Sequence, residues 1–178
     1  GLSLVGSEMC IRDRLDEYGS EHIHLKNDSK EIVFMVMFRT IPESSSGVAH
    51  ILEHTTLCGS ENYKVRDPFF MMLRRSMSTF MNAFTASDWT AYPFATQNKK
   101  DFFNLLDVYL DAVYFPILAE EDFKQEGHRI EFSKYDKSNS PLEYKGVVFN
   151  EMKGSMSNIQ SITWQALTKS LFPDLTLS

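Results

Sequence analysis

Apolar and polar residues alternate along the first part of the chain with the periods of short strands and a helix. Residues 21–25 and 31–39 alternate or run apolar, and the turn-forming residues 27–29 separate them, which predicts a β-hairpin. Residues 48–57 then have apolar positions at helical spacing, and Gly59 follows as a stop signal. The chain therefore begins with strands and changes to helix.

The middle of the chain repeats this mixture. Asp67 and Pro68 are typical of a helix start, with Asp as the N-cap residue and Pro at the first helical position. Residues 79–86 and 89–96 are rich in β-branched and aromatic residues and predict a second pair of strands. Residues 99–115 predict a long amphipathic helix.

The last third is mainly helical in pattern. Helices are expected at residues 120–126, 146–155 and 159–171, with a short strand at 130–132 and a polar linker at 134–141. Strand pairs interspersed with helices, without regular βαβ alternation, predict the α+β fold class.

Composition narrows the class of protein. The 178 residues are 43% hydrophobic and 24% charged, which is the balance of a globular domain and excludes disorder of the whole chain. A net charge of −6 argues against nucleic acid as a partner. The longest apolar run, Ile32–Phe38, is far shorter than the roughly 20 residues of a membrane span, so no membrane segment is expected. Cys10 and Cys58 cannot form a disulfide framework and favour a reducing compartment.

Both ends of the chain have unusual sequences. Residues 1–14 lack the pattern of a signal peptide and show no strand or helix period, and Ser7–Arg14 resembles a translated sequencing-library adapter. We therefore expect residues 1–14 to be non-native and residues 15–178 to be part of a domain. Residues 172–178 contain no element that would close a domain, so the C-terminal end is also expected to be cut.

One histidine pair has the spacing of a metal site. His50 and His54 frame the pattern H-x-x-E-H, and residues four apart share one face of a helix, so both imidazoles can reach one ion. Glu53 projects beside them, where a carboxylate can take a proton from a metal-bound water. Zinc suits two imidazoles and a carboxylate. Taken alone, the motif is matched equally well by two hydrogen-bonded helix histidines beside a surface glutamate.

A zinc enzyme of this kind needs a third protein ligand from further along the chain. Spacing does not choose among the downstream glutamates, which are Glu120, Glu121, Glu126, Glu131, Glu143 and Glu151. Apolar neighbours slightly favour Glu151, because they would bury its helix and a buried carboxylate needs a metal or a cation as partner.

Several longer segments resemble one known family. They are residues 47–54, 57–60, 66–70, 78–88, 92–94, 125–127 and 145–154. From about His22 to the C-terminus the chain resembles the presequence protease branch of the pitrilysin/insulinase zinc metallopeptidases. The resemblance implies a two-layer α+β domain, with a mainly antiparallel sheet packed against helices, and makes residues 15–178 a partial N-terminal catalytic domain.

The same resemblance implies roles for individual residues. It implies His50, His54 and Glu151 as the ligands of one Zn²⁺ ion and Glu53 as the general base. It also implies that a peptide substrate adds as a strand to an exposed sheet edge, with the backbone of Asn82 and Ala83 as its nearest partner. The expected activity is endoproteolysis of short unstructured peptides, such as cleaved presequences.

The aromatic side chains near that edge have a simpler explanation. Phe80, Phe84 and Trp89 are expected to pack in the core.

Two departures from the family pattern limit the resemblance. Insulin-degrading relatives have a glutamate seven residues before the third ligand, where this chain has Tyr144, so the groups that support the ligands are unassigned. Members of the family are also several times longer, and their C-terminal half, which completes the site, is missing here. Two alternatives follow: a non-catalytic peptide-binding or structural subunit of the same family, or a fragment that is inactive in isolation.

The resemblance also bears on location. Members of this branch are soluble intracellular proteins of the bacterial cytoplasm, the mitochondrial matrix or chloroplasts, and the sequence does not decide among these compartments.

Overall fold

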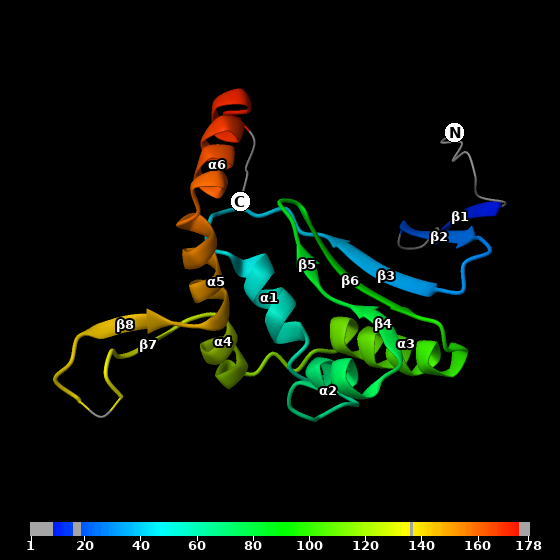
Figure 1. The fold of residues 1–178 in the computed structure, drawn as a ribbon, viewed down its shortest axis with the longest axis horizontal. Coiled ribbons are helices and arrows are strands. Elements are labelled where there is room, and N and C mark those ends of the chain that lie inside the picture. Colours follow the sequence, from blue (N-terminus) through cyan, green and yellow to red (C-terminus); the bar gives the residue numbers. More distant parts are fainter. Residues whose placement is uncertain (1–8, 16–18, 136, 175–178) are drawn as a thin grey trace.

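The computed structural model describes residues 9–15, 19–135 and 137–174, and its elements are labelled in Figure 1. The elements, in chain order, are β1 (Met9–Leu15), β2 (Ser20–Lys26), β3 (Ile32–Arg39), α1 (Val48–Thr56), α2 (Pro68–Arg75), β4 (Ser78–Met81), β5 (Phe84–Thr85), β6 (Trp89–Thr96), α3 (Lys99–Tyr114), α4 (Glu120–Glu126), β7 (Arg129–Phe132), β8 (Leu142–Lys145), α5 (Val147–Met156) and α6 (Ile159–Leu171). Helices alternate with antiparallel strand pairs, so the predicted α+β class is confirmed.

The main sheet is built around β6. Strand β3 pairs with β6 along its full length, from Ile32 opposite Thr96 to Arg39 opposite Trp89. Strands β4 and β5 pair with the other side of β6, and every pairing is antiparallel. All residues of β6 except Trp89 are buried. The central strand is therefore the rigid support of the sheet.

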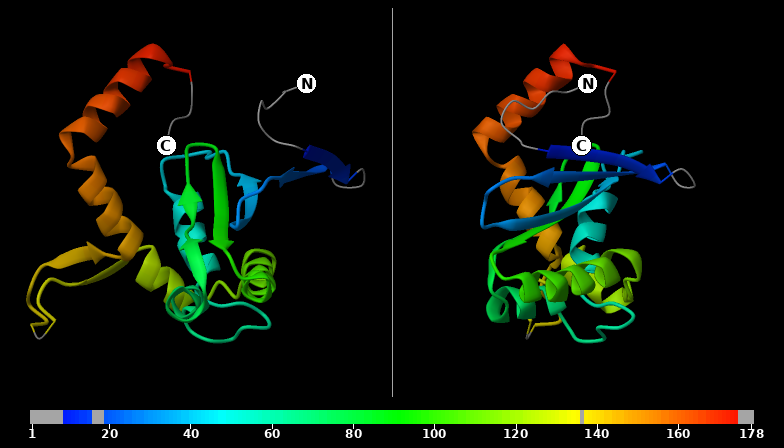
Figure 2. Two further views of the ribbon diagram at one scale, coloured as in Figure 1. Left: turned by 45° about the vertical axis from the view of Figure 1, so that its right-hand side comes forward. Right: turned by 90° about the vertical axis from the view of Figure 1, so that its right-hand side faces the viewer.

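The hydrophobic core lies between this sheet and α3. Phe94 on β6 is fully buried, and its ring centroid lies 5.1 Å from that of Tyr109 and 5.4 Å from that of Phe34. Leu105 is fully buried in the same cluster. Figure 2 shows α3 below the sheet, with α2 beside it. Apolar residues at helical spacing on α3 thus pair with the inward face of β3 and β6, and this forms the two layers.

The predicted N-terminal hairpin is wrong in its pairing. Both strands exist, but β2 pairs with β1 and β3 pairs with β6. Asn27 Oδ1 accepts a hydrogen bond from the Ser29 N–H at 2.8 Å, and Ser29 Oγ accepts one from the Glu31 N–H at 3.1 Å. These local turns lead the chain onward, while the apolar inner face of β3 packs on the core. Burial against α3 therefore outweighs the short-range hairpin signal.

The N-terminal residues add a strand that no pattern predicted. Residues 9–15 form β1, whereas residues 1–8 lie outside the described residues. The non-native origin of residues 1–14 stays a prediction, because backbone pairing does not distinguish native from appended sequence. At the other end, α6 stops at Leu171, and residues 175–178 also lie outside the described part.

The remaining differences are local. The predicted strand at residues 79–86 is divided into β4 and β5, and β8 occupies residues that were assigned to no element. Helix α2 starts at Pro68 as expected, but Asp67 has a left-handed backbone (φ 56°) and its side chain makes no capping bond. The helices at 99–115, 120–126, 146–155 and 159–171 are confirmed within a residue at each end.

The aromatic side chains near the sheet edge are also placed differently from the prediction. Phe80 and Phe84 are 46% and 41% exposed, and their rings stack on each other with centroids 6.4 Å apart. Trp89 is 36% exposed. The expectation of core packing for these three residues is wrong, because the edge strands present one face to solvent.

The remaining elements, α4, the β7–β8 hairpin, α5 and α6, lie to one side of the sheet, next to α1 (Figure 1). These elements bury few side chains: Val148 is the buried residue of α5, while α4 and α6 have none. Among the described residues no helix is both long enough and apolar enough to cross a membrane.

Candidate metal centre

Three helices meet beside the sheet: α1, α4 and α5. Gly127 lies where α4 ends, and a Cβ atom there would stand 3.1 Å from Ile51 Cγ2 on α1 and 2.9 Å from the Phe123 carbonyl oxygen. Even an alanine side chain would therefore crowd both the backbone of α4 and Ile51 of α1. The absence of a side chain at Gly127 therefore sets the close approach of α4 to α1.

A second glycine brings α5 to the same place. In the β7–β8 hairpin Arg129 lies opposite Lys145, so the chain returns to Gly127 when it reaches Gly146. A Cβ on Gly146 would lie only 2.0 Å from the Gly127 carbonyl oxygen, so the two backbones are in direct contact. Helix α5 starts from this contact and carries Glu151 back to α1.

The predicted ligands converge at this junction. His50 and His54 lie one turn apart on α1 with ring centroids separated by 5.1 Å. Glu151 Oε2 lies 3.5 Å from His50 Nε2 and 3.6 Å from His54 Nε2. Within the described ranges, this is the one group of three or more His, Cys, Asp or Glu side chains whose ligand atoms all lie within 4.8 Å of one another.

The donor set suits a zinc ion. Two imidazole nitrogens and one carboxylate oxygen are the ligands of catalytic zinc sites, which leave a position for water. The His50 and His54 side chains are 25% and 22% exposed, whereas that of Glu151 is 52% exposed. The burial argument for Glu151 is therefore wrong, because α5 contacts its neighbours along one side only. Its proximity to the two histidines is what distinguishes Glu151.

The other glutamates have different surroundings. Glu120 pairs with Lys124 at 2.6 Å, and Glu131 lies 2.8 Å from both Arg129 and Lys145. The Lys145 contact and then the Arg129 contact lower the pKa of Glu131. Glu121 and Glu143 are exposed.

Glu126 is the exception among them. Its Oε2 lies 3.1 Å from His54 Nδ1, the ring nitrogen that faces away from Glu151, and its side chain is only 12% exposed. The sequence named Glu126 as one of several possible ligands but gave no sign of this contact. Only the packing of α4 on α1 reveals it.

Glu53 lies on the same helix as the two histidines but is not one of the three converging side chains. It is 7% exposed, and α1 packs against β6. Burial raises the pKa of Tyr92 on β6 to about 12, and the charge of Glu53 adds to this shift, while a hydrogen bond with Thr56 opposes it. The Glu53 carboxylate is thus held at low solvent exposure beside the histidines of its own helix.

Cys58 is not part of the group. Burial, reinforced by Asp122 and Glu126, raises the pKa of its thiol to about 12. Cys58 therefore stays a protonated, buried side chain near neutral pH.

The two edge residues interrupt the outer strand. Asn82 and Ala83 separate β4 from β5, which in turn contacts α1. The Asn82 N–H donates to the Pro93 carbonyl at 3.2 Å, whereas the Ala83 N–H donates to Asn82 Oδ1 at 3.0 Å. The Ala83 N–H is thus bonded to a neighbouring side chain and not to the sheet.

Tyr144 does not replace the missing glutamate. Its ring lies between those of His128 and Phe149, with centroid distances of 6.1 and 5.8 Å, so it packs beneath α5.

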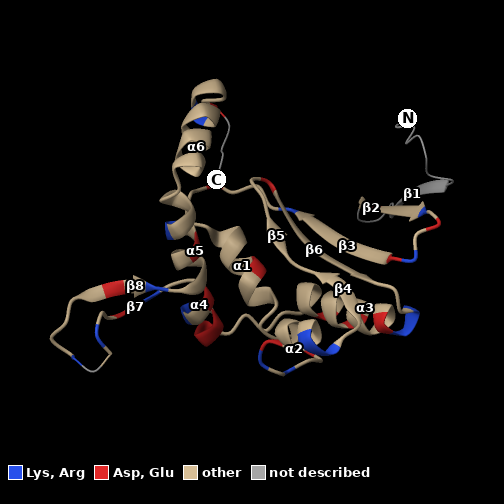
Figure 3. Cartoon of the chain, viewed as in Figure 1, with Lys and Arg blue, Asp and Glu red and all other residues tan. Residues whose placement is uncertain are grey.

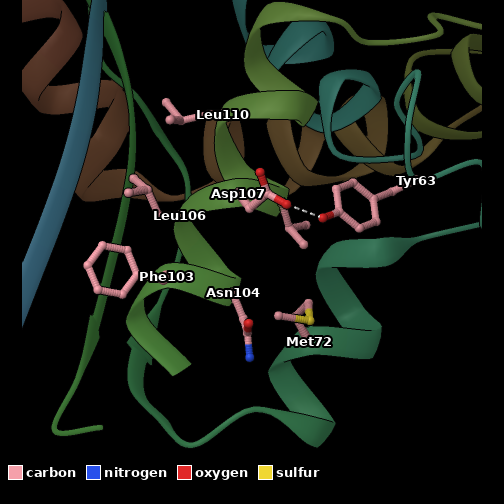
Figure 4. A pocket seen from close by; sticks show the side chains of 8 residues that line it. Tyr63, Met72, Phe103, Asn104, Leu106, Asp107 and Leu110 are labelled. Carbon is pink, nitrogen blue, oxygen red and sulfur yellow. Dashed lines mark hydrogen bonds between the residues drawn. The ribbon is translucent and has the colours of Figure 1, made fainter. Parts of the chain in front are cut away.

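An open pocket of about 620 Å³ lies between α2 and α3, and none of the candidate site residues lines it. In Figure 4, Tyr63 donates its hydroxyl to Asp107 at the pocket edge, at 2.5 Å. Figure 3 shows acidic and basic segments mixed along α4, β7, β8 and α3.

The α+β fold and the convergence of two imidazoles with a carboxylate define a domain with a candidate metal centre. The insulinase family model (peptidase family M16) matches residues 39–162. The chain belongs to this family.

Comparison with individual proteins refines this assignment. The chain is 57% identical over 163 residues to the mitochondrial presequence protease of Xenopus tropicalis and 58% identical over 163 residues to that of Danio rerio. Each alignment covers 92% of this chain and 16% of the relative. The predicted resemblance to the presequence protease branch is confirmed, and the chain spans about a sixth of the length of these relatives.

Solved structures agree on the fold. A protease from Helicobacter pylori superposes with a TM-score of 0.56 at 22% identity, covering 65% of this chain and 28% of that one. Pitrilysin superposes with a TM-score of 0.53 at 25% identity, covering 65% of this chain and 13% of that one. The two-layer architecture is therefore shared with known proteases.

Proposed function

We propose that this chain is part of a zinc metalloendopeptidase that hydrolyses short unstructured peptides, such as presequences. The convergence of His50, His54 and Glu151 supports the proposal most directly. The names of the mitochondrial presequence proteases support the substrate class.

The chain supplies the ligands and the base of this reaction. His50, His54 and Glu151 would hold the ion. When bound, zinc polarises the scissile carbonyl and lowers the pKa of a water molecule toward 7, an effect that these three ligands leave room for. Glu53, one residue before His54 and at low exposure, would serve as the general base in this reaction and would return the proton to the leaving amine.

The sheet edge would orient the substrate. We propose that the extended peptide pairs with Asn82 and Ala83, beside α1. The Ala83 N–H is bonded to the Asn82 side chain, so a substrate carbonyl can take its place without breaking a sheet hydrogen bond. Main-chain pairing of this kind binds peptides of many sequences.

The rest of the protein and its location complete the proposal. Because the chain spans 16% of its relatives, the remainder of the same polypeptide is the expected partner that closes the site, and the chain alone is expected to be inactive. Among the compartments expected from the sequence, the relatives named mitochondrial favour the mitochondrion.

The decisive variant is Glu53→Gln in the complete encoded protein. It removes the base and leaves the three ligands, so zinc content should stay at one ion while cleavage of a quenched-fluorescence peptide falls about 10²–10⁴-fold. Glu61→Gln, an exposed glutamate after α1, is the matched control and should cleave normally.

Other results have distinct meanings. Unchanged cleavage by Glu53→Gln would refute the role of Glu53. A wild-type protein that binds zinc but cleaves no peptide would favour the non-catalytic alternative, and a wild-type protein without zinc would refute the metal centre itself.

A further inference from the structure

A series of side-chain hydrogen bonds connects the α1–α2 loop to His54. Arg66 Nη2 donates to Gln125 Oε1, and Gln125 Nε2 donates to Glu126 Oε1 at 2.9 Å. The other oxygen of Glu126, Oε2, lies 3.1 Å from His54 Nδ1. Gln125 and Glu126 each use a different atom for each neighbour, so the series of hydrogen bonds is continuous from Arg66 to His54.

The chemistry of Arg66 fixes which atom donates and which atom accepts in each of these hydrogen bonds. A guanidinium can only donate, so it orients the Gln125 amide with its oxygen toward Arg66 and its NH₂ group toward Glu126. A carboxylate can only accept, so the hydrogen between Glu126 and His54 belongs to His54 Nδ1. In the neutral ring the lone pair then lies on Nε2, the atom that is 3.6 Å from Glu151 Oε2.

The surrounding fold holds both ends of this hydrogen-bond series in place. The loop that carries Arg66 is fixed to α3, since Asp111 accepts bonds from Asn62 N at 3.0 Å and from Asn62 Nδ2 at 2.6 Å. At the other end, Gly127 follows Glu126 directly and lies against α1 at Ile51. The backbone at Glu126 is therefore held beside α1, within reach of His54.

We propose that Glu126, oriented by Gln125, is a positioning residue that sets the tautomer and the orientation of His54 for metal binding. The inference rests on the proposed zinc site and adds to it a group that does not itself bind the ion. It also accounts for the sequence Gln125-Glu126-Gly127 as a unit: an orienting amide, a carboxylate acceptor and a close helix contact.

The test is Glu126→Gln in the complete encoded protein. The substituted amide keeps the shape but has one acceptor for two donors, Gln125 Nε2 and His54 Nδ1, so one of them must face an NH₂ group. The dissociation constant for zinc, measured by competition with a chromophoric chelator, should rise about 10–100-fold. Glu121→Gln, an exposed glutamate of the same helix, is the matched control and should bind zinc like the wild type.

A second readout separates positioning from general stability. With Co²⁺ in place of Zn²⁺, the visible absorption bands should shift in Glu126→Gln and stay unchanged in Glu121→Gln, because only the former alters the orientation of a ligand ring. Glu126→Asp keeps the charge but is one methylene shorter, and it should weaken zinc binding as well. It serves as the test variant if circular dichroism shows that the Gln variant is unfolded.

The outcomes distinguish this inference from the proposed function. Wild-type zinc affinity and an unchanged Co²⁺ spectrum in a folded Glu126 variant would overturn the inference and leave the zinc site intact. A wild-type protein that binds no zinc would overturn both.

Discussion

The α3–sheet core and the three-helix junction are held together by different forces. The core is a cluster of large apolar side chains, in which Phe94 and Leu105 are fully buried and Tyr109 is 1% exposed. At the junction, α4 buries no residue and α5 buries one. Glycine contacts and polar side chains connect its helices instead. Burial of apolar surface stabilises the core, whereas the stability of the junction is expected to depend on the proposed zinc ion.

The largest effect should come from breaking the core. Phe94→Ala removes a fully buried ring and should lower the free energy of local opening by about 3–5 kcal/mol. Hydrogen–deuterium exchange of peptides from β6 and α3 measures this change. Phe103→Ala on α3 is the control, since that ring is 56% exposed and its loss should have little effect. Equal exchange in the two variants would mean that the core is elsewhere.

The next largest effect should come from separating the helices of the junction. Gly146→Ala places a Cβ 2.0 Å from the Gly127 carbonyl oxygen, so the start of α5 must move, at a cost of about 3 kcal/mol. Zinc affinity should fall while exchange in β6 and α3 is unchanged.

Gly154→Ala is the matched control on the same helix. A Cβ there meets nothing within 4 Å, and alanine favours helix, so zinc affinity should be retained. Weak zinc binding by Gly154→Ala and normal binding by Gly146→Ala would contradict the account of the junction.

Removal of zinc tests, without a substitution, whether the junction depends on the ion and the core does not. A ligand at 100 times its dissociation constant stabilises its site by about 2.7 kcal/mol. Chelation should therefore raise amide exchange in α5, which carries Glu151, and leave α3 unaffected. Equal changes in both helices would show that the core and the junction open as one unit.

The smallest effect concerns the start of α3. Asn98 Oδ1 accepts hydrogen bonds from the backbone N–H groups of Lys100 and Asp101 at 2.9 and 3.1 Å. Asn98→Ala should destabilise the first turn of α3 by about 1 kcal/mol, measured by thermal unfolding, without changing zinc affinity. Asn104→Ala, in the middle of the same helix, should cost less.

Local sequence patterns predicted which residues form helices and strands better than they predicted which strands pair. The helix that carries His50 and His54 follows from apolar spacing, and α3 follows from its amphipathic face. The pairing of β3 with β6 could not be predicted locally, because it depends on an inner face that packs on a helix some sixty residues later in the chain.

The candidate site likewise contains residues that local spacing predicted and residues that it could not predict. His50, Glu53 and His54 stand within one turn of one helix, so their spacing alone suggested a metal motif. Glu151 was favoured for a burial that it does not have, and only the family resemblance pointed to it firmly. Glu126 reaches His54 through the packing of α4 on α1 at Gly127, and a contact of that kind leaves no periodic signal in the sequence.

The binding of one zinc ion by His50, His54 and Glu151 is the proposal on which the others rest. Anomalous diffraction at the zinc edge from crystals of the complete protein tests it most directly. We expect one peak, about 2.0–2.2 Å from His50 Nε2, His54 Nε2 and an oxygen of Glu151, with Glu126 bonded to His54 and not to the ion. No peak at this site, or a peak ligated by Glu53 or Glu126 in place of Glu151, would contradict it.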